Sequence, residues 1–300
     1  MSDVIDAHVH FWREGSKQSQ WLDCPPYSED ARYDCLRGDF LPRQLFEEMA
    51  SCGVSHAIHV QASNCLEDNY QAFGFASQDA RICGLVAWAP LDSPQLCETL
   101  FREWQARKDI LGIRYLINIE PDPQWILGRD QIASLELVAA NGFAFDFIGI
   151  TIEHLHALSN LARQLPQLKI VLDHLNTPDL ASESNQEWFD LIKQISRFPN
   201  IFAKISGLNI GADWGSWDID DLSPFLNHGL RCFGGGRLIY GSNWPVANLA
   251  GGYRKYFNEL CRWVEASAPH DSDGIFKFNA TEAYGIDPLP IADFAGGSFK

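Results

Sequence analysis

The chain has 300 residues, of which 46% are hydrophobic and 21% are charged, a composition typical of a globular protein with a large core. Its 39 acidic and 23 basic side chains give a formal net charge of −16, which argues against binding nucleic acid or an anionic membrane through a general basic surface. The 8 cysteines have no metal-site spacing, and no signal peptide or membrane-spanning run is evident. We therefore expect a cytoplasmic protein with reduced thiols.

Short apolar runs alternate with helical patterns along the whole chain. We expect strands over residues 4–11, 55–62, 82–90, 110–117, 143–148, 169–175, 201–206 and 237–244. We expect helices over residues 39–51, 66–79, 94–107, 130–141, 153–164, 185–197, 220–231 and 253–268. This alternation predicts an α/β fold with parallel strands, a single (β/α)8 TIM barrel over residues 1–300. No glycine-rich turn follows the first strand, so a dinucleotide-binding fold has no support.

Two segments lie outside this alternation. Residues 12–38 contain two prolines and four aromatic side chains and show no helical period. Because connections of this length are uncommon unless they are functional or disordered, we expect a packed flap over the active site. Residues 270–300 are expected to form a C-terminal helix and tail. The flap and the loop around Trp214 and Trp217 are expected to determine which substrate is bound.

Polar side chains collect at the expected strand ends, where barrel enzymes place their chemistry. His8 and His10 share one face of the first strand, because residues two apart on a strand point the same way. Two converging imidazoles can hold a divalent metal, bind an anion or share a proton. The other polar residues near strand ends are Gln61, Arg114, Asp146, Asp173, His174, Lys204, Ser206 and Asn243.

Structural roles compete with functional ones at these positions. About half of the strand-end polar groups are expected to be structural, for example as a salt bridge between Arg114 and Asp146. Two histidines of the second strand lie early or in the middle of it and are interpreted as structural, namely His56 and His59. Four others lie on helices or loops and are expected at the surface: His154, His156, His228 and His270.

Five stretches in order along the chain, residues 5–12, 112–114, 171–175, 203–208 and 240–246, resemble the amidohydrolase superfamily. The closest resemblance is to its lactonase branch, which acts on sugar lactones and pyrone-dicarboxylate lactones. The resemblance implies the same barrel and hydrolysis of a lactone by attack of water on the carbonyl. It also implies that three histidines line the reaction centre and hold a metal in many members, and that two cations bind substrate groups or stabilise the oxyanion. These residues are His8, His10, His174, Arg114 and Lys204.

The eighth strand departs from the family pattern. The position of the usual aspartate, the general base, is Asn243 here. An amide cannot take the proton, although it can position water or substrate. It also lacks the charge to hold a metal well, so we expect no tightly bound metal, or at most one zinc or manganese ion on His8, His10 and His174. His174 is then the expected base, with Asp146 as the second candidate.

The expected substrate is a small-molecule lactone, in particular a sugar-acid (aldono) lactone. The residues expected to bind it are Arg114, Gln61, Asp146, Trp88, Trp244 and Ser206. Trp88 and Trp244 are included because aromatic rings at strand ends suit a ring-shaped substrate. Two alternatives remain open: a metal-dependent hydrolase or nonoxidative decarboxylase of the same superfamily, and a catalytically inactive homologue that binds a sugar acid. A homo-oligomer is compatible with the sequence, because outer helices can pair without a sequence signature.

Overall fold

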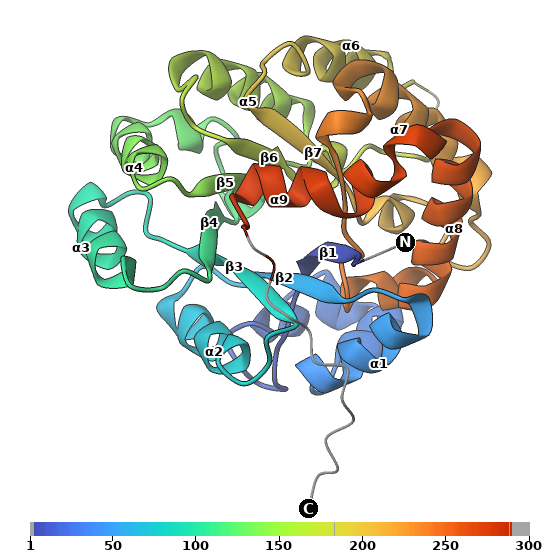
Figure 1. The fold of residues 1–300 in the computed structure, drawn as a ribbon, viewed down its shortest axis with the longest axis horizontal. Helices are drawn as coiled ribbons and strands as arrows, with labels where there is room; N and C mark the ends of the chain where they lie inside the picture. The colour runs from blue at the N-terminus through green and yellow to red at the C-terminus, as the bar shows by residue number, and fades with distance from the viewer. Residues whose placement is uncertain (1–2, 183, 288, 290–300) are drawn as a thin grey trace, which may run out of the picture.

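The computed structural model describes residues 3–182, 184–287 and 289, and its eight parallel strands lie side by side in sequence order (Figure 1). They are β1 (Ile5–Val9), β2 (His56–Val60), β3 (Ile82–Trp88), β4 (Ile110–Tyr115), β5 (Ala144–Phe147), β6 (Ile170–Leu172), β7 (Ile201–Ile205) and β8 (Leu238–Tyr240). The backbone N–H of His10 donates to the carbonyl of Trp244, and that of Asn243 to the carbonyl of His8. These bonds join the two edges, so the predicted (β/α)8 barrel is confirmed.

Helices surround the strands (Figure 1). The outer ones are α1 (Pro42–Cys52), α2 (Leu66–Ala76), α3 (Pro94–Trp104), α4 (Arg129–Ala140), α5 (Ile152–Gln164), α6 (Gln186–Ile195), α7 (Ile219–Phe233) and α8 (Gly252–Ser267). In α6, Trp188, Leu191, Ile192 and Ile195 recur at helical spacing and are buried, whereas Lys193 is exposed. One apolar stripe of this kind is what packs a helix onto the sheet.

A further helix, α9 (Asn279–Tyr284), lies across the end of the barrel at which β1 begins (Figure 1). Its Ala280, Ala283 and Tyr284 pack with side chains inside the barrel, such as Ile5 and Val171. A larger apolar cluster fills the space between the strands and the outer helices. The strands are therefore buried on both faces, which explains why they are nearly continuous apolar runs in the sequence.

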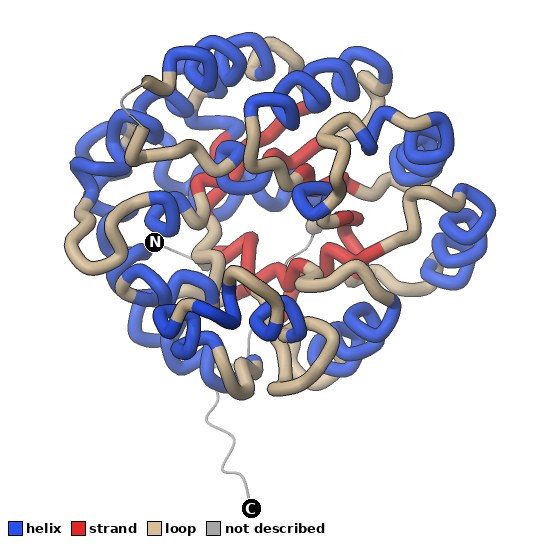
Figure 2. The backbone as a smooth tube through the Cα atoms, turned by 180° about the vertical axis from the view of Figure 1, so that it is seen from behind, coloured by secondary structure: helices blue, strands red, loops and turns tan. Residues whose placement is uncertain are grey.

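Loops and short helices lie around the opposite end of the barrel (Figure 2). The segment of residues 12–38 contains three short 3₁₀ helices, at Gln20–Asp23, Tyr27–Glu29 and Ala31–Leu36. Helices this short leave no amphipathic period, which is why the sequence does not reveal them. Trp12, Leu22 and Leu36 are buried in a small cluster with Leu249, so the segment is packed.

Every strand ends before its predicted last residue, by one or two residues in six of them, by three at Leu172 in β6 and by four at Tyr240 in β8. After β6 the backbone turns into the left-handed region for four residues in a row, with φ of 55° at His174, 49° at Leu175, 61° at Asn176 and 47° at Thr177. Left-handed backbone is incompatible with strand pairing. Strain of this kind in non-glycine residues concentrates at functional sites.

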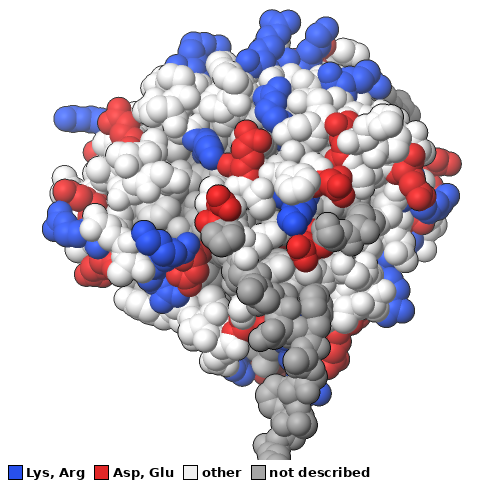
Figure 3. Space-filling view, in the orientation of Figure 1, with Lys and Arg blue, Asp and Glu red and all other residues white. Residues whose placement is uncertain are grey.

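Acidic and basic side chains are interspersed on the face seen in Figure 3. Two histidines expected at the surface are not exposed. His154 is buried in the first turn of α5, where its Nδ1 lies 2.9 Å from Oγ1 of Thr151, and His228 is half-buried, with Nε2 2.8 Å from the carbonyl of Phe189. No helix in the described ranges has both the length and the apolar character needed to cross a membrane. Of the helix and tail expected over residues 270–300, positions 288 and 290–300 lie outside the described residues.

Candidate active site

Four charged side chains from neighbouring strands meet inside the barrel. Nη1 of Arg114 lies 3.0 Å from Oδ2 of Asp173, and Nζ of Lys204 lies 2.5 Å from Oδ2 of Asp146 and 3.1 Å from Oδ1 of Asp173. All four side chains are almost completely buried, and two cations balance two anions. Arg114 and Asp146 face each other in the register of β4 and β5, but the expected salt bridge between them is wrong, because Asp146 pairs with Lys204 and Arg114 reaches Asp173.

The two carboxylates differ in their pKa values, because Lys204 acts on both whereas His8 and Arg114 act on Asp173. Burial raises the pKa of Asp146 to about 6, although Lys204 acts in the opposite direction. Burial would also raise the pKa of Asp173, but Lys204, His8 and Arg114 together hold it well below its usual value. Asp173 is therefore the anion around which both cations gather.

Three histidines join this cluster. His8 lies between Lys204 and His10, with Nδ1 3.2 Å from Nζ of Lys204 and Nε2 3.2 Å from Nε2 of His10. The ring centroids of His8 and His174 are 4.5 Å apart. Nδ1 of His174 lies 2.7 Å from Oγ of Ser206. The structure thus brings together the three histidines and Lys204 from β1, β7 and the turn after β6.

All three imidazoles are neutral near pH 7. Burial lowers the pKa of His8 and of His10 well below the usual value and lowers that of His174 to about 4. Nδ1–H of His10 donates to the carbonyl of Val60 over 2.7 Å, which leaves a lone pair on Nε2.

With the proton on Nε2, His8 donates to His10 and its Nδ1 accepts from Lys204. Arg114, with Nη1 3.4 Å from Nε2, and Asp173, with Oδ1 3.3 Å from Nδ1, favour the opposite tautomer, so the donation from Lys204 is what keeps the proton on Nε2.

His174 has the opposite assignment from His8. Its Nδ1 faces both the hydroxyl of Ser206 and, at 3.1 Å, the backbone carbonyl of the same residue. Only a donor satisfies a carbonyl, so Nδ1 carries the proton and Nε2 keeps its lone pair. Ser206 therefore orients His174, and His174 can accept a proton at Nε2.

Asn243 and Gly207 enclose His174 from the side of β7 and β8. A Cβ added at Gly207, whose φ is +64°, would lie 2.8 Å from Nδ2 of Asn243 and 3.0 Å from Nδ1 of His174. No other residue type fits there without displacing one of them. Asn243 itself has a φ of 60°, a conformation that asparagine and aspartate tolerate better than most residues.

Three side chains of the cluster have the ligand types that one divalent metal ion needs. His8, Asp173 and His174 offer ligand atoms that all lie within 4.8 Å of one another, and two imidazoles with one carboxylate suit zinc or manganese. The grouping includes Asp173 instead of the expected His10. Two cations oppose such an ion, since Nη1 of Arg114 lies 3.4 Å from Nε2 of His8 and Nζ of Lys204 lies 3.2 Å from its Nδ1.

A cavity of about 340 Å³ opens onto this cluster. His10 and Arg114 reach it from the barrel, and segment 12–38 contributes three aromatic side chains and one cation to its wall. The complete lining is His10, Trp12, Lys17, Trp21, Tyr27, Ala62, Ser63, Asn64, Arg114, Leu116, Asn118, Ile119, Ile148 and Val246. Aromatic faces with a few convergent polar groups are typical of sites for small ring-shaped ligands.

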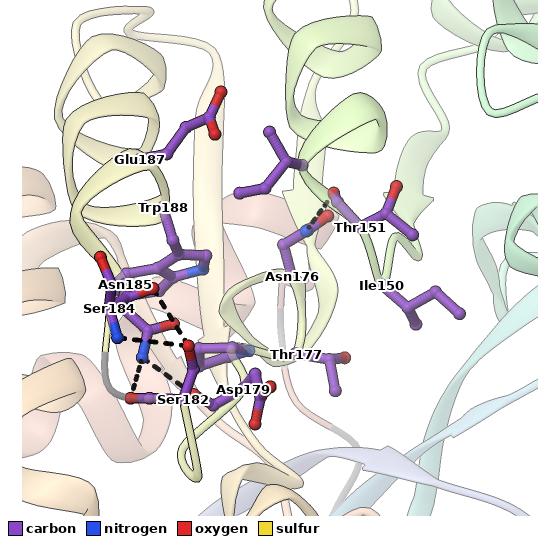
Figure 4. A pocket seen from close by; sticks show the side chains of 12 residues that line it. Ile150, Thr151, Asn176, Thr177, Asp179, Ser182, Ser184, Asn185, Glu187 and Trp188 are labelled. Carbon is purple, nitrogen blue, oxygen red and sulfur yellow. Dashed lines mark hydrogen bonds between the residues drawn. The ribbon is translucent and has the colours of Figure 1, made fainter.

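A second cavity, of about 250 Å³, lies between the loops that follow β5 and β6 (Figure 4). Asn176, which lines it, donates from Nδ2 to the carbonyl of Thr151 over 3.0 Å. Asn176 and Thr177 come two and three residues after His174 in the chain, but neither His174 nor any other expected site residue lines this cavity. His174 lines neither cavity, but His10 and Arg114 line the first one, which makes it the candidate substrate site.

The remaining expected substrate-binding residues lie in three different environments. Gln61 is buried, and its backbone carbonyl accepts from Nη2 of Arg114. Asp146 lies in the charge cluster, away from the cavity lining. Trp244 is buried against Phe11 and Phe40, and Trp88 is half-buried; neither is among the residues that line the cavity.

Several residues of the site carry no sequence signal. Tyr284 lies in a short helix that is far from any strand along the sequence, yet its hydroxyl donates a hydrogen bond to Asp146. Lys17, Asn64 and Asn118 reach the cavity from loops, where hydrophobic periodicity says nothing about side-chain direction. Asp173 does carry a signal, since a charge at the end of an apolar strand is costly unless it is paired or functional.

The chain was compared with known proteins. The amidohydrolase family model matches residues 5–286. An L-fucono-1,5-lactonase of Burkholderia ambifaria is 33% identical over 295 residues, covering 96% of this chain and 97% of that protein. An L-fucono-1,5-lactonase of Burkholderia multivorans is 28% identical over 282 residues, covering 87% of this chain and 88% of that protein. A crystal structure of an amidohydrolase from Burkholderia multivorans with bound zinc superimposes with a TM-score of 0.87 at 26% identity, covering 95% of this chain and all of that chain (100%).

Proposed function

Because this chain belongs to the amidohydrolase family, we propose that it is a lactonase that opens the ring of a sugar-acid lactone by attack of water on the carbonyl. The observation that carries the proposal is the state of His174. Its imidazole is neutral, and Ser206 holds it through Nδ1 so that the lone pair is on Nε2. It lies beside the charge-balanced cluster, onto which the cavity opens. A positioned imidazole of this kind is suited to general-base catalysis.

The residues divide the reaction as follows. Nε2 of His174 takes a proton from the attacking water, and the tetrahedral oxyanion forms beside the guanidinium of Arg114, which lines the cavity. When the intermediate collapses, the ring oxygen leaves as an alkoxide and takes the proton back from His174, which yields the open hydroxy acid. Asn243, beside His174, positions the water rather than deprotonating it.

Lys204 acts within the cluster in this scheme. It is completely buried, forms hydrogen bonds with Asp146 and His8, and pairs with the charge of Asp173 at 3.1 Å. We propose that it fixes His8 and the charge on Asp173, and that Arg114 stabilises the oxyanion.

We also propose that the reaction needs no tightly held metal. A divalent ion on His8, Asp173 and His174 would polarise the carbonyl and lower the pKa of a bound water. The positive charges of Arg114 and Lys204, each within 3.4 Å of a His8 nitrogen, weaken binding of such an ion.

The cavity supports a sugar lactone as the substrate class. The rings of Trp21 and Tyr27 meet edge to face at 4.9 Å and form an apolar wall, while Asn64 and Asn118 offer amides for ring hydroxyls. Lys17 and Arg114 provide the cations of this lining, one for each carboxylate of a dicarboxylate, so the pyrone-dicarboxylate lactone belongs in the same test. The two relatives named as L-fucono-1,5-lactonases make that lactone the first substrate to test. Segment 12–38 acts as the flap that sets this choice.

The test is hydrolysis of a panel of aldonolactones, with L-fucono-1,5-lactone and 2-pyrone-4,6-dicarboxylate included, followed by a pH indicator before and after chelation. Turnover that survives chelation and is lost in His174→Asn supports the proposal. Turnover that is lost on chelation and restored by zinc or manganese would assign the reaction to a metal-dependent enzyme instead. Binding without turnover, with activity gained in Asn243→Asp, would identify an inactive sugar-acid binder, the candidate that Asn243 favours.

A further inference from the structure

The hydroxyl of Tyr284, the last residue of α9, reaches the charge cluster from the closed end of the barrel. It lies 2.8 Å from Oδ1 and 2.9 Å from Oδ2 of Asp146. Burial raises the pKa of Tyr284 well above its usual value, so the phenol remains a hydrogen-bond donor. A short helix near the C-terminus thus contacts the group that pairs with Lys204.

The chain of contacts continues from Asp146 to the candidate reaction centre. Oδ2 of Asp146 accepts from Nζ of Lys204 over 2.5 Å, and the same Nζ lies 3.2 Å from Nδ1 of His8. Nε2 of His8 in turn lies 3.2 Å from Nε2 of His10, which lines the cavity. Asp146, Lys204 and His8 are each completely buried, so water does not compete for these bonds.

We propose that Tyr284 is a positioning residue, which holds Asp146 so that Lys204 donates to Nδ1 of His8 and thereby keeps the His8 proton on Nε2. The effect on the rate rests on the proposed lactonase function, whereas the effect on His8 does not. Among the described residues, the side chain of Asp146 receives hydrogen bonds from Lys204 and Tyr284. Without the phenol, Lys204 is left as the donor to the Asp146 side chain. Its Nζ already lies 2.5 Å from Oδ2, so the released carboxylate turns and shifts Nζ with it, which changes the contact between Nζ and Nδ1 of His8.

Tyr284→Phe isolates this link, since it removes one hydroxyl and keeps the ring whose centroid lies 5.5 Å from Nζ of Lys204. Tyr256→Phe is the matched control. Tyr256 is completely buried, and its hydroxyl donates to the backbone carbonyl of Ile205 over 3.2 Å, next to Lys204 in sequence but outside the charge cluster. Both variants lose a buried phenol hydrogen bond, so a general loss of packing or stability affects both.

Two measurements test the role of Tyr284. The first is nitrogen NMR of protein labelled with ¹⁵N-histidine, in which the His8 signals are identified by their loss in His8→Gln and report which ring nitrogen carries the proton. The second is kcat and KM for the lactone that wild type hydrolyses. We expect Tyr284→Phe to change the His8 signals and to lower kcat about tenfold, the lower end of what losing a supporting hydrogen bond costs, with KM within about twofold. Tyr256→Phe should change neither.

Unchanged His8 signals in a folded Tyr284→Phe protein would overturn the proposal, and so would equal changes in both variants. If wild type hydrolyses no lactone, the proposed function fails, but the NMR comparison still decides the role of Tyr284. If Tyr284→Phe does not fold, Asp146→Asn tests the same link from its other side. It keeps a partner for the phenol and weakens the hold on Lys204, so the His8 signals should again differ from those of wild type, and unchanged signals would overturn the proposal.

Discussion

Lys204 is the side chain whose loss the charge cluster tolerates least. Lys204→Met keeps most of the volume and removes the cation, so Asp146 and Asp173 remain with Arg114 as their only cationic partner within the cluster described here. Both carboxylates are completely buried. Breaking a buried ion pair by removing one partner costs about 3–5 kcal/mol, because the carboxylate left behind either stays uncompensated in the interior or has to take up a proton. We expect a loss of about 4 kcal/mol of unfolding free energy.

The measurement is thermal and urea denaturation at pH 7. For domains somewhat smaller than this one, about 2–4 °C is lost per kcal/mol, so the midpoint should fall by roughly 10 °C. Lys193→Met, on the exposed side of α6, is the control and should stay within about 0.5 kcal/mol.

A double variant checks the cause. Lys204→Met with Asp146→Asn removes one charge of each sign and leaves the Arg114–Asp173 pair balanced. It should recover about half of the lost stability, because residues in one charge network are not additive. If Lys204→Met alone costs less than about 1 kcal/mol, or if the double variant is less stable than the single one, the account of the cluster as a balanced set of buried charges is refuted.

Three further variants test the site. His174→Asn should lower kcat for lactone hydrolysis at least 10²-fold, because it removes the general base, and a fully active variant would exclude His174 from that role. Gly207→Ala should lower kcat more than about tenfold, since its methyl group would lie within 3.0 Å of Asn243 and His174 and displace them. A crystal structure of the variant in which both side chains keep their wild-type positions would contradict this reason. Lys17→Ala should raise KM about threefold to tenfold with kcat unchanged, because Lys17 lines the cavity from segment 12–38 and is exposed. A change in kcat alone would instead mean that Lys17 takes part in the chemical step.

The fold could be predicted from the sequence because each strand and helix has a hydrophobic pattern that can be recognised within its own residues. The apolar runs before His8, Arg114 and Lys204 are strands buried on both faces, and α6 has a regular apolar stripe. Barrel geometry then places the polar strand ends near one another without any knowledge of side-chain contacts. This is why the histidines, Arg114 and Lys204 were predicted at one site and occur together.

The pairing of the charges could not be predicted, because it depends on side-chain reach and not on register. Arg114 and Asp146 are neighbours across β4 and β5, yet the arginine is long enough to reach Asp173 while Asp146 is held by Lys204 and Tyr284. The left-handed backbone at His174 could not be predicted from the sequence either, since none of the residues that adopt it is a glycine. A backbone strained in this way is maintained only by tertiary contacts, which no local pattern encodes.

Asn243 fits this charge arrangement better than an aspartate would. Its φ of 60° suits both residues equally, so the backbone does not explain the choice. The cluster already balances Arg114 and Lys204 against Asp146 and Asp173. A carboxylate at position 243, beside His174, would add a third buried anion, which needs either a proton or a further cation as its counterion. The neutral amide removes that need, and with it the electrostatic demand for a metal at this position. The proposed function therefore assigns the proton to His174.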